Sequence, residues 1–252
     1  MFKFLTFVIF AISATSTYSQ LFFPEPSQTA GEIVGKIDDA PFVTSIYINR
    51  ELVCGAVIIN DYFVLTAAAC IKTRNTSAYT IRAGSLSHNY GGSIHYVNAI
   101  IVHKDFHINQ YNLPVNDIAL IKVNQQFQFN GQRDALPIYP RRFVDSTSTG
   151  KIYGWGVRGS QLRKGSVYIY NTRNCNAFYQ GKLPNGQICA IANSSKTPCK
   201  NDAGGPFVIG VHLVGIISWG KNCDLDGTPD VYTDVNFYRD WIDGNMKEFY
   251  PH

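Results

Sequence analysis

Short runs of β-branched and aromatic residues, separated by glycine and other turn residues, follow one another along most of the 252-residue chain. Many such runs in series predict strands arranged in a sandwich or a barrel. Residues 236–249 place Tyr238, Trp241, Ile242 and Met246 near helical spacing, which predicts a closing C-terminal helix. We therefore expect an all-β protein with one terminal helix. The expected strands are 41–50, 51–60, 62–68, 79–83, 94–102, 118–123, 146–153, 165–170, 187–191, 206–209, 213–219 and 230–234.

The N-terminus has the pattern of a secretory signal. Lys3 precedes an apolar stretch at 4–14, and mostly small residues follow up to residue 19. This stretch of about 11 residues is too short to span a bilayer, which needs about 20. Residues 20–32 contain two prolines and no periodicity, and are interpreted as a short propeptide. The sequence predicts a secreted, extracellular protein with no membrane anchor.

The chain has six cysteines, which fit an oxidising compartment. Spacing alone does not choose among the 15 possible pairings. Neither a CxxC nor an HExxH pattern is present, so we expect no metal and no cofactor. The formal net charge is +4, but the basic residues are scattered along the sequence, which argues against a nucleic-acid partner.

Six short motifs, in the correct order, resemble those of the chymotrypsin-like serine proteases. They lie at 54–55, 66–70, 116–120, 154–156, 202–206 and 218–220. Residues 85–92 and 237–242 look particularly like the mite group 3 trypsin-like allergens. The resemblance implies two antiparallel six-stranded β-barrels within a domain at 33–252, roughly 33–140 and 141–235, with a cleft between them. It also implies the disulfides Cys54–Cys70, Cys175–Cys189 and Cys199–Cys223.

Two of the three catalytic positions implied by the resemblance hold alanine. Where the family reads Thr-Ala-Ala-His-Cys, this chain has Ala69 in place of the histidine, and Ala203 replaces the serine of Gly-Asp-Ser-Gly-Gly-Pro. Asp117 keeps the third position. A methyl group can neither accept a proton nor attack a carbonyl carbon. The chain therefore resembles the scabies mite inactivated protease paralogues, and we expect no proteolytic activity.

The positions that would bind substrate also depart from the family pattern. Asn201 replaces the glycine whose amide forms the oxyanion hole, and either its side chain disturbs that donor or it adopts the same backbone angles. Thr197 stands where trypsin-like members carry the aspartate that pairs with a substrate Lys or Arg. Asp230 replaces a glycine of the pocket wall, and we favour obstruction of the pocket over a restored negative charge. Ser218 and Gly220 belong to the strand that would pair with a substrate backbone.

The activation switch of the family is half retained. Its new N-terminus would be Ile33, whose freed amine would pair with buried Asp202. Glu32 precedes this bond, so an activator of trypsin-like specificity should not cut it, whereas a protease of different specificity could. Asn75 and Asn193 begin glycosylation sequons, and we expect them to be candidate sites in a secreted chain.

Binding is therefore the expected function. The resemblance implies host plasma proteins as partners, in particular complement components, and inhibition of that cascade by a monomeric protein. Three alternatives remain open. The chain is a decoy or regulator of active proteases, their substrates or inhibitors, which would need an open cleft; it is an enzyme with an unrecognised nucleophile; or it is a duplicated product without function.

Overall fold

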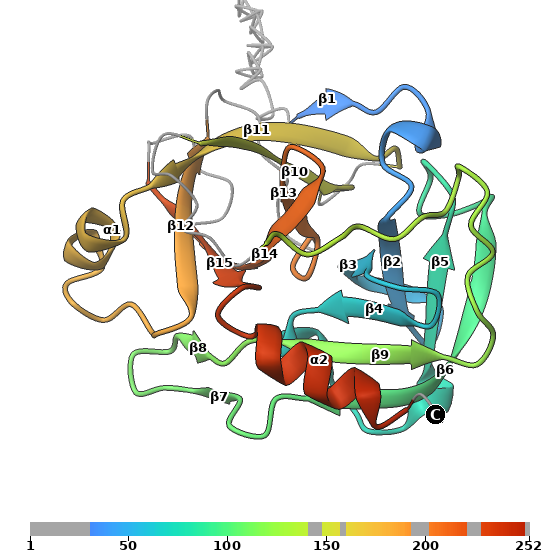
Figure 1. Ribbon diagram of the computed structural model, residues 1–252, viewed down its shortest axis with the longest axis horizontal. Coiled ribbons are helices and arrows are strands. Elements are labelled where there is room, and N and C mark those ends of the chain that lie inside the picture. The colour runs from blue at the N-terminus through green and yellow to red at the C-terminus, as the bar shows by residue number, and fades with distance from the viewer. Residues whose placement is uncertain (1–30, 141–147, 157–159, 193–201, 221–227, 250–252) are drawn as a thin grey trace, which may run out of the picture.

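The computed structural model describes residues 31–140, 148–156, 160–192, 202–220 and 228–249. Its first half forms a closed antiparallel barrel, on the right in Figure 1, with the strand order β2-β3-β4-β9-β6-β5. The barrel closes because β2 pairs with β5 as well as with β3. Its strands are β2 (Val43–Ile48), β3 (Glu51–Ile58), β4 (Phe63–Thr66), β5 (Tyr79–Ala83), β6 (Ser93–Val102) and β9 (Ala119–Val123).

The second half forms a similar ring, on the left in Figure 1, with the order β11-β10-β13-β14-β15-β12. This ring closes because β12 pairs with both β15 and β11. The expected fold of two antiparallel six-stranded barrels is thus confirmed. The strands are β10 (Thr149–Gly154), β11 (Arg163–Tyr170), β12 (Gln187–Ala192), β13 (Pro206–Ile209), β14 (His212–Trp219) and β15 (Asp230–Asp234).

Several short elements were not expected from the sequence. They are β1 (Glu32–Ile33), the hairpin of β7 (His107–Ile108) and β8 (Pro114–Val115), α1 (Thr172–Phe178), and the 3-10 turns η1 (Ile37–Asp39), η2 (Ala68–Cys70) and η3 (Thr76–Ala78). The strand β1 pairs with β11, so the start of the chain joins the second barrel.

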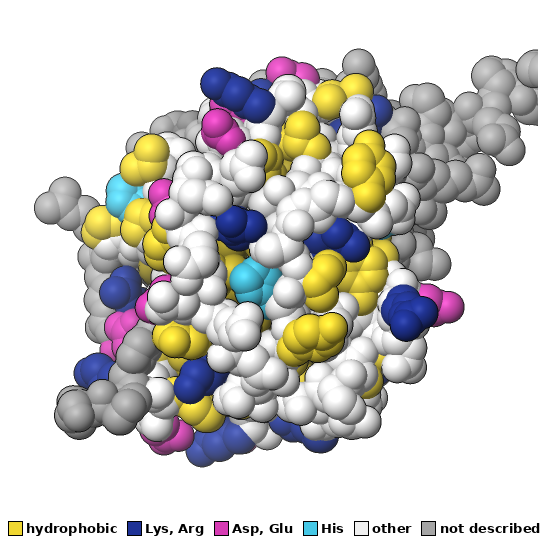
Figure 2. Space-filling view, turned by 90° about the vertical axis from the view of Figure 1, so that its right-hand side faces the viewer, with side chains coloured by type: hydrophobic (Ala, Val, Ile, Leu, Met, Phe, Trp, Pro, Cys, Tyr) yellow, Lys and Arg dark blue, Asp and Glu magenta, His cyan; other side chains and the backbone are white. Residues whose placement is uncertain are grey.

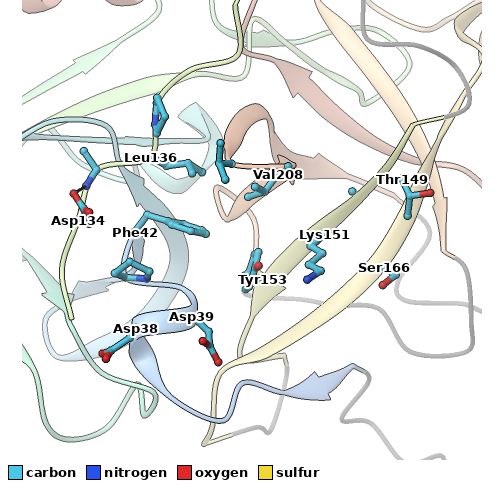
Figure 3. Close-up of a pocket in the computed structure, with 16 residues that line it drawn as sticks. Asp38, Asp39, Phe42, Asp134, Leu136, Thr149, Lys151, Tyr153, Ser166 and Val208 are labelled. Carbon is cyan, nitrogen blue, oxygen red and sulfur yellow. Dashed lines mark hydrogen bonds between the residues drawn. The ribbon is translucent and has the colours of Figure 1, made fainter. Parts of the chain in front are cut away.

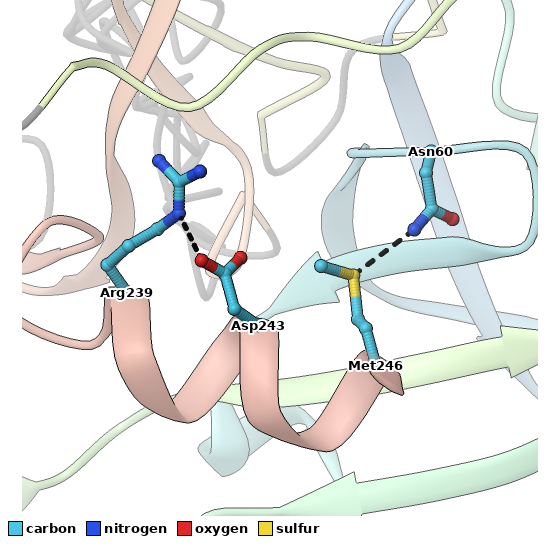
Figure 4. Close-up of polar contacts among 4 residues, drawn as sticks. All are labelled: Asn60, Arg239, Asp243 and Met246. Atoms are coloured by element: carbon cyan, nitrogen blue, oxygen red, sulfur yellow. Dashed lines mark hydrogen bonds and ion pairs between the residues drawn. The ribbon is translucent and has the colours of Figure 1, made fainter. Parts of the chain in front are cut away.

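The C-terminal helix is confirmed but is shorter than predicted. It is α2 (Arg239–Lys247), because Asp234 first accepts the amides of Asn236 and Phe237 in a turn. The helix crosses in front of the first barrel in Figure 1. Figure 4 shows an ion pair between Arg239 and Asp243 of 2.8 Å, and a contact of 3.1 Å from the Asn60 amide to the Met246 sulfur. The Arg239–Asp243 pair lies within the helix, whereas the Asn60–Met246 contact and the buried side chain of Ile242 fix the helix to the barrel.

One hydrophobic cluster joins the two barrels. It contains residues of both, among them Phe42 and Leu120 of the first and Tyr153 and Ile216 of the second. The rings of Phe42 and Tyr153 meet edge to face with centroids 5.4 Å apart. Trp155 is buried and its indole nitrogen donates a hydrogen bond of 2.9 Å to the carbonyl of Leu86. This shared core fixes the two barrels relative to each other.

Two of the three expected disulfides lie within the described residues. Cys54–Cys70 ties β3 to η2, and Cys175–Cys189 ties α1 to β12. Each is expected to contribute about 2–5 kcal/mol to the free energy of unfolding. Cys199 and Cys223 lie outside the described residues.

The outer face of the first barrel carries a mixed surface. Figure 2 shows Lys and Arg side chains standing apart from one another between apolar ones. Ile94 and Tyr96 of β6 are 43% and 67% exposed. Among the described residues, no helix combines the length and apolar character needed to cross a membrane. Nor do these residues bring together three His, Cys, Asp or Glu side chains in a way that would hold a metal ion.

Candidate functional site

The structure brings the three degenerate catalytic positions together between the barrels. Ala69 lies in η2, Asp117 lies just before β9, and Ala203 lies just before β13 of the second barrel. The carbonyl oxygen of Ala203 accepts the amide of Gly55 at 2.9 Å and lies 3.5 Å from the sulfur of Cys70. Positions 69 and 203 are therefore close together, because Cys70, which follows Ala69, contacts Ala203.

Asp117 is buried, with 1% of its surface exposed. One carboxylate oxygen accepts the amide of Ala69 at 2.8 Å, and the other accepts the hydroxyl of Ser218 at 2.5 Å. Burial raises the pKa of the Asp117 carboxyl above its ordinary value, and these hydrogen bonds partly offset that effect. None of the described histidines hydrogen bonds to Asp117. The carboxylate is satisfied by a backbone amide and a serine, without an imidazole.

Lys72 is a neighbour of this site that the sequence did not single out. Its ammonium donates a hydrogen bond of 2.7 Å to the carbonyl of Ala69. Its charge also acts on Asp117 and lowers the pKa of that carboxyl, although less than burial raises it. The only sequence signal was its position three residues after Ala69.

Substitution of Asp117→Asn is expected to remove one component of the pH dependence of stability. Because the pKa of Asp117 is raised on folding, the folded protein binds the proton more readily than the unfolded chain. Wild-type stability therefore falls as the pH rises from the unfolded value of about 3.9 through the raised folded value. Asparagine keeps an acceptor for the Ala69 amide and carries no charge. The variant should therefore not lose stability over this pH range.

Urea unfolding of Asp117→Asn at a series of pH values between 3 and 8, on the order of one unit apart, measures this effect. Glu51→Gln is the matched control, because Glu51 is exposed at the start of β3. An Asp117→Asn variant whose stability follows the same pH curve as the control and the wild type would contradict the assignment.

Asp230 lies against the strand that would receive a substrate backbone. A Cβ atom built on Gly220 would lie 2.1 Å from a carboxylate oxygen of Asp230. The Asp230 side chain thus fills the space directly beside Gly220, just beyond the end of β14. Thr197 and Asn201, the other two positions of this kind, lie outside the described residues.

The two residues that flank the expected activation cut lie on an edge strand of the second barrel. Glu32 and Ile33 form β1 and pair with Lys164 and Arg163 of β11. The Glu32 carboxylate forms an ion pair of 3.2 Å with Lys164, and Ile33 is 47% exposed. Pairing with Arg163 therefore holds Ile33 on an outer edge of the second barrel.

Asp202, the expected partner of a freed Ile33 amine, is buried with 1% of its surface exposed. Its carboxylate accepts the amide of Trp155 at 2.7 Å and that of Gly156 at 3.0 Å. The fit is close, because a Cβ atom on Gly154 would lie 2.1 Å from the Asp202 carboxyl carbon. Backbone amides of the second barrel therefore supply partners for this buried carboxyl group, which the sequence alone did not indicate.

Asn75, the first residue of one sequon, is exposed and caps η3. Its side-chain oxygen accepts the amide of Ser77 at 3.1 Å and the Ser77 hydroxyl at 2.8 Å. Its glycosylation stays a prediction. Asn193 lies outside the described residues.

The two barrels, the cleft positions and the disulfides together define a protein of the trypsin class. The trypsin family model matches residues 31–242. The chain therefore belongs to the trypsin family.

Known relatives extend this result. The chain is 31% identical to trypsin alpha of Drosophila melanogaster over 229 residues, which are 85% of this chain and 88% of that protein. It is 32% identical to trypsin delta of the same species over 232 residues, which are 86% of this chain and 90% of that protein. The solved structure of neuropsin, a serine protease expressed in the limbic system of mouse brain, is similar, with a TM-score of 0.77 and 27% sequence identity. The matched region covers 86% of this chain and 98% of the neuropsin chain.

Proposed function

We propose that this chain is a proteolytically inactive member of the trypsin family that acts by binding. The observation that carries the proposal is the pair of methyl groups at Ala69 and Ala203, beside a buried Asp117 that is already satisfied by the Ala69 amide and Ser218. In a protease of convergent mechanism, removal of the catalytic triad lowers turnover by about 10⁶. The loss of both reactive groups is more than binding or backbone donors can compensate.

Neighbouring hydroxyl groups are poor substitutes for the missing serine. The hydroxyl of Ser218 donates to Asp117, and that of Thr66 donates to the carbonyl of Gly55 at 2.9 Å. Neither has an imidazole partner, which is the base that activates a serine in this family. The side chain of Asp230 against Gly220 further opposes entry of a substrate, and it also counts against the decoy function, which needs an open cleft.

The partner we propose is a host plasma protein, in particular a complement component. The support is the resemblance to the scabies mite inactivated protease paralogues, together with disulfide bonds typical of secreted proteins. A rigid scaffold tied by disulfides presents loops that are suited to recognition. We propose that the mature protein is secreted, acts as a monomer and inhibits the cascade it binds.

Capture from host plasma tests this proposal. The purified, disulfide-bonded chain is immobilised, plasma is passed over it, and retained proteins are identified by mass spectrometry. The control is an active trypsin whose nucleophile is changed to alanine. Selective retention of complement proteins is expected. Retention of proteases or their inhibitors alone would favour the decoy, and a profile equal to the control would contradict binding to plasma proteins.

A further inference from the structure

A groove of about 600 Å³ opens where the start of the first barrel meets the outer side of the second (Figure 3). It is distinct from the cleft, because neither Ala69, Asp117 nor Ala203 lines it. Its walls come from η1, from residues 134–137 between the barrels, from β10 and β11, and from the turn between β13 and β14. A cavity of this size is in the range that holds small ligands or short peptide segments.

The rim of the groove is acidic in a protein whose formal net charge is +4. Asp38 and Asp39 contribute two carboxylates from η1, and Asp134 contributes a third. Among the described residues that line it, Lys151 is the one basic residue, which leaves an excess of two negative charges over those residues. None of the three aspartates forms an ion pair with a described residue. The groove therefore presents negative charge that the described part of the protein does not neutralise.

The floor is apolar and contains one open polar group. Phe42, Leu136 and Val208 are buried there. Tyr153 is only 6% exposed, yet its hydroxyl makes no hydrogen bond to any described residue and faces the groove. Burial, and secondarily the charge of Asp39, raises the pKa of Tyr153, so the hydroxyl stays protonated and available as a donor. The hydroxyl therefore offers a donor to a ligand that enters the groove.

We propose that this groove binds a basic peptide segment of a partner protein. An arginine or lysine of that segment lies among Asp38, Asp39 and Asp134, an adjoining apolar side chain packs on Phe42, and a polar group meets the Tyr153 hydroxyl. The chain's own residues 20–30 are a poorer occupant, because they contain Glu25 and neither Arg nor Lys. This inference holds whether or not the cleft is catalytically active.

Fluorescence anisotropy with a labelled, amidated Arg-Phe-Arg-Leu-Arg peptide tests the site, with peptide integrity checked by mass spectrometry. Two control peptides replace arginine by glutamate, or the apolar residues by glycine. The Asp38→Asn, Asp39→Asn double variant is expected to weaken binding of the basic peptide about tenfold at low salt, and less at high salt. A Glu51→Gln, Asp105→Asn double variant, with the same charge change at exposed positions elsewhere, should bind as the wild type does.

Val211→Ser probes the apolar contribution without endangering the fold, because Val211 is 70% exposed at the groove. It is expected to weaken binding about threefold for the apolar-containing peptide only. Four outcomes would overturn the proposal. The first is that the basic peptide does not bind, and the second is that both double variants weaken its binding equally. The third is that Asp230→Asn weakens peptide binding while the Asp38→Asn, Asp39→Asn double variant does not, and the fourth is self-association of the chain that this double variant abolishes. The third would place the peptide in the cleft, and the fourth would make a second copy the occupant.

Discussion

The Ala69→His, Ala203→Ser double variant is expected to react with diisopropyl fluorophosphate, which phosphorylates activated serines, at least about 10³-fold faster than either single variant. The scaffold for this reversal is present, because the Asp117 carboxylate lies 2.8 Å from the amide of residue 69 and remains buried. A histidine alone has nothing to activate, and a serine alone has no base. The effects of the two substitutions should therefore be far from additive.

The wild-type chain and the two single variants are the controls, and stoichiometric labelling of residue 203 is read by mass spectrometry. In the double variant, the rate of cleavage of arginine substrates should increase less than the rate of labelling, because Asp230 still lies against Gly220. Wild-type labelling as fast as that of the double variant would contradict the account, as would a single variant that reacts equally well.

Gly204→Ala is expected to lower the free energy of unfolding by about 3–5 kcal/mol. Gly204 follows Ala203 and has a φ of +80°, which a side chain disfavours. A Cβ atom there would lie 2.0 Å from the Thr66 hydroxyl and 2.4 Å from the Gly55 carbonyl. The turn therefore brings the backbones of the two barrels into direct contact, and there is no room for a methyl group.

Gly131→Ala separates crowding from backbone strain. Gly131 has a similar φ of +82°, but nothing lies within 4 Å of its built Cβ atom. This control should lose only about 1–2 kcal/mol. Urea unfolding of both variants measures the difference, and equal losses would show that the close approach at Gly204 has no energetic weight.

The strands of both barrels could be predicted because strand patterning is local. The predicted strand at 79–83 has the bounds of β5, and its buried and partly buried residues alternate. By contrast, α1 lacks helical hydrophobic spacing. It depends on Asn171, whose side chain caps the amides of Arg173 and Asn174, and on the disulfide from Cys175 to β12. Contacts of that kind are not visible in a hydrophobic pattern.

The residues of the two candidate sites also divide into those that a local motif reveals and those that only the fold brings together. Ala69 and Ala203 could be found because each lies inside a contiguous motif. The sequence left two alternatives for Asp230, obstruction of the pocket and a restored negative charge, and its position against Gly220 is a contact that no sequence pattern reveals. The acidic groove could not be foreseen, since its carboxylates come from residues 38, 39 and 134 and its floor extends to residue 208. Only the packing of one barrel on the other brings these groups together.

Turnover is the most direct test of the central claim. Hydrolysis of an arginine ester and of casein is measured for the purified chain, both uncut and beginning at Ile33, against an active trypsin as standard. The account predicts no turnover above buffer, a deficit of about 10⁶ or more relative to the standard. Turnover that co-purifies with the chain and disappears in an Asp117→Ala variant would show that the chain is an enzyme.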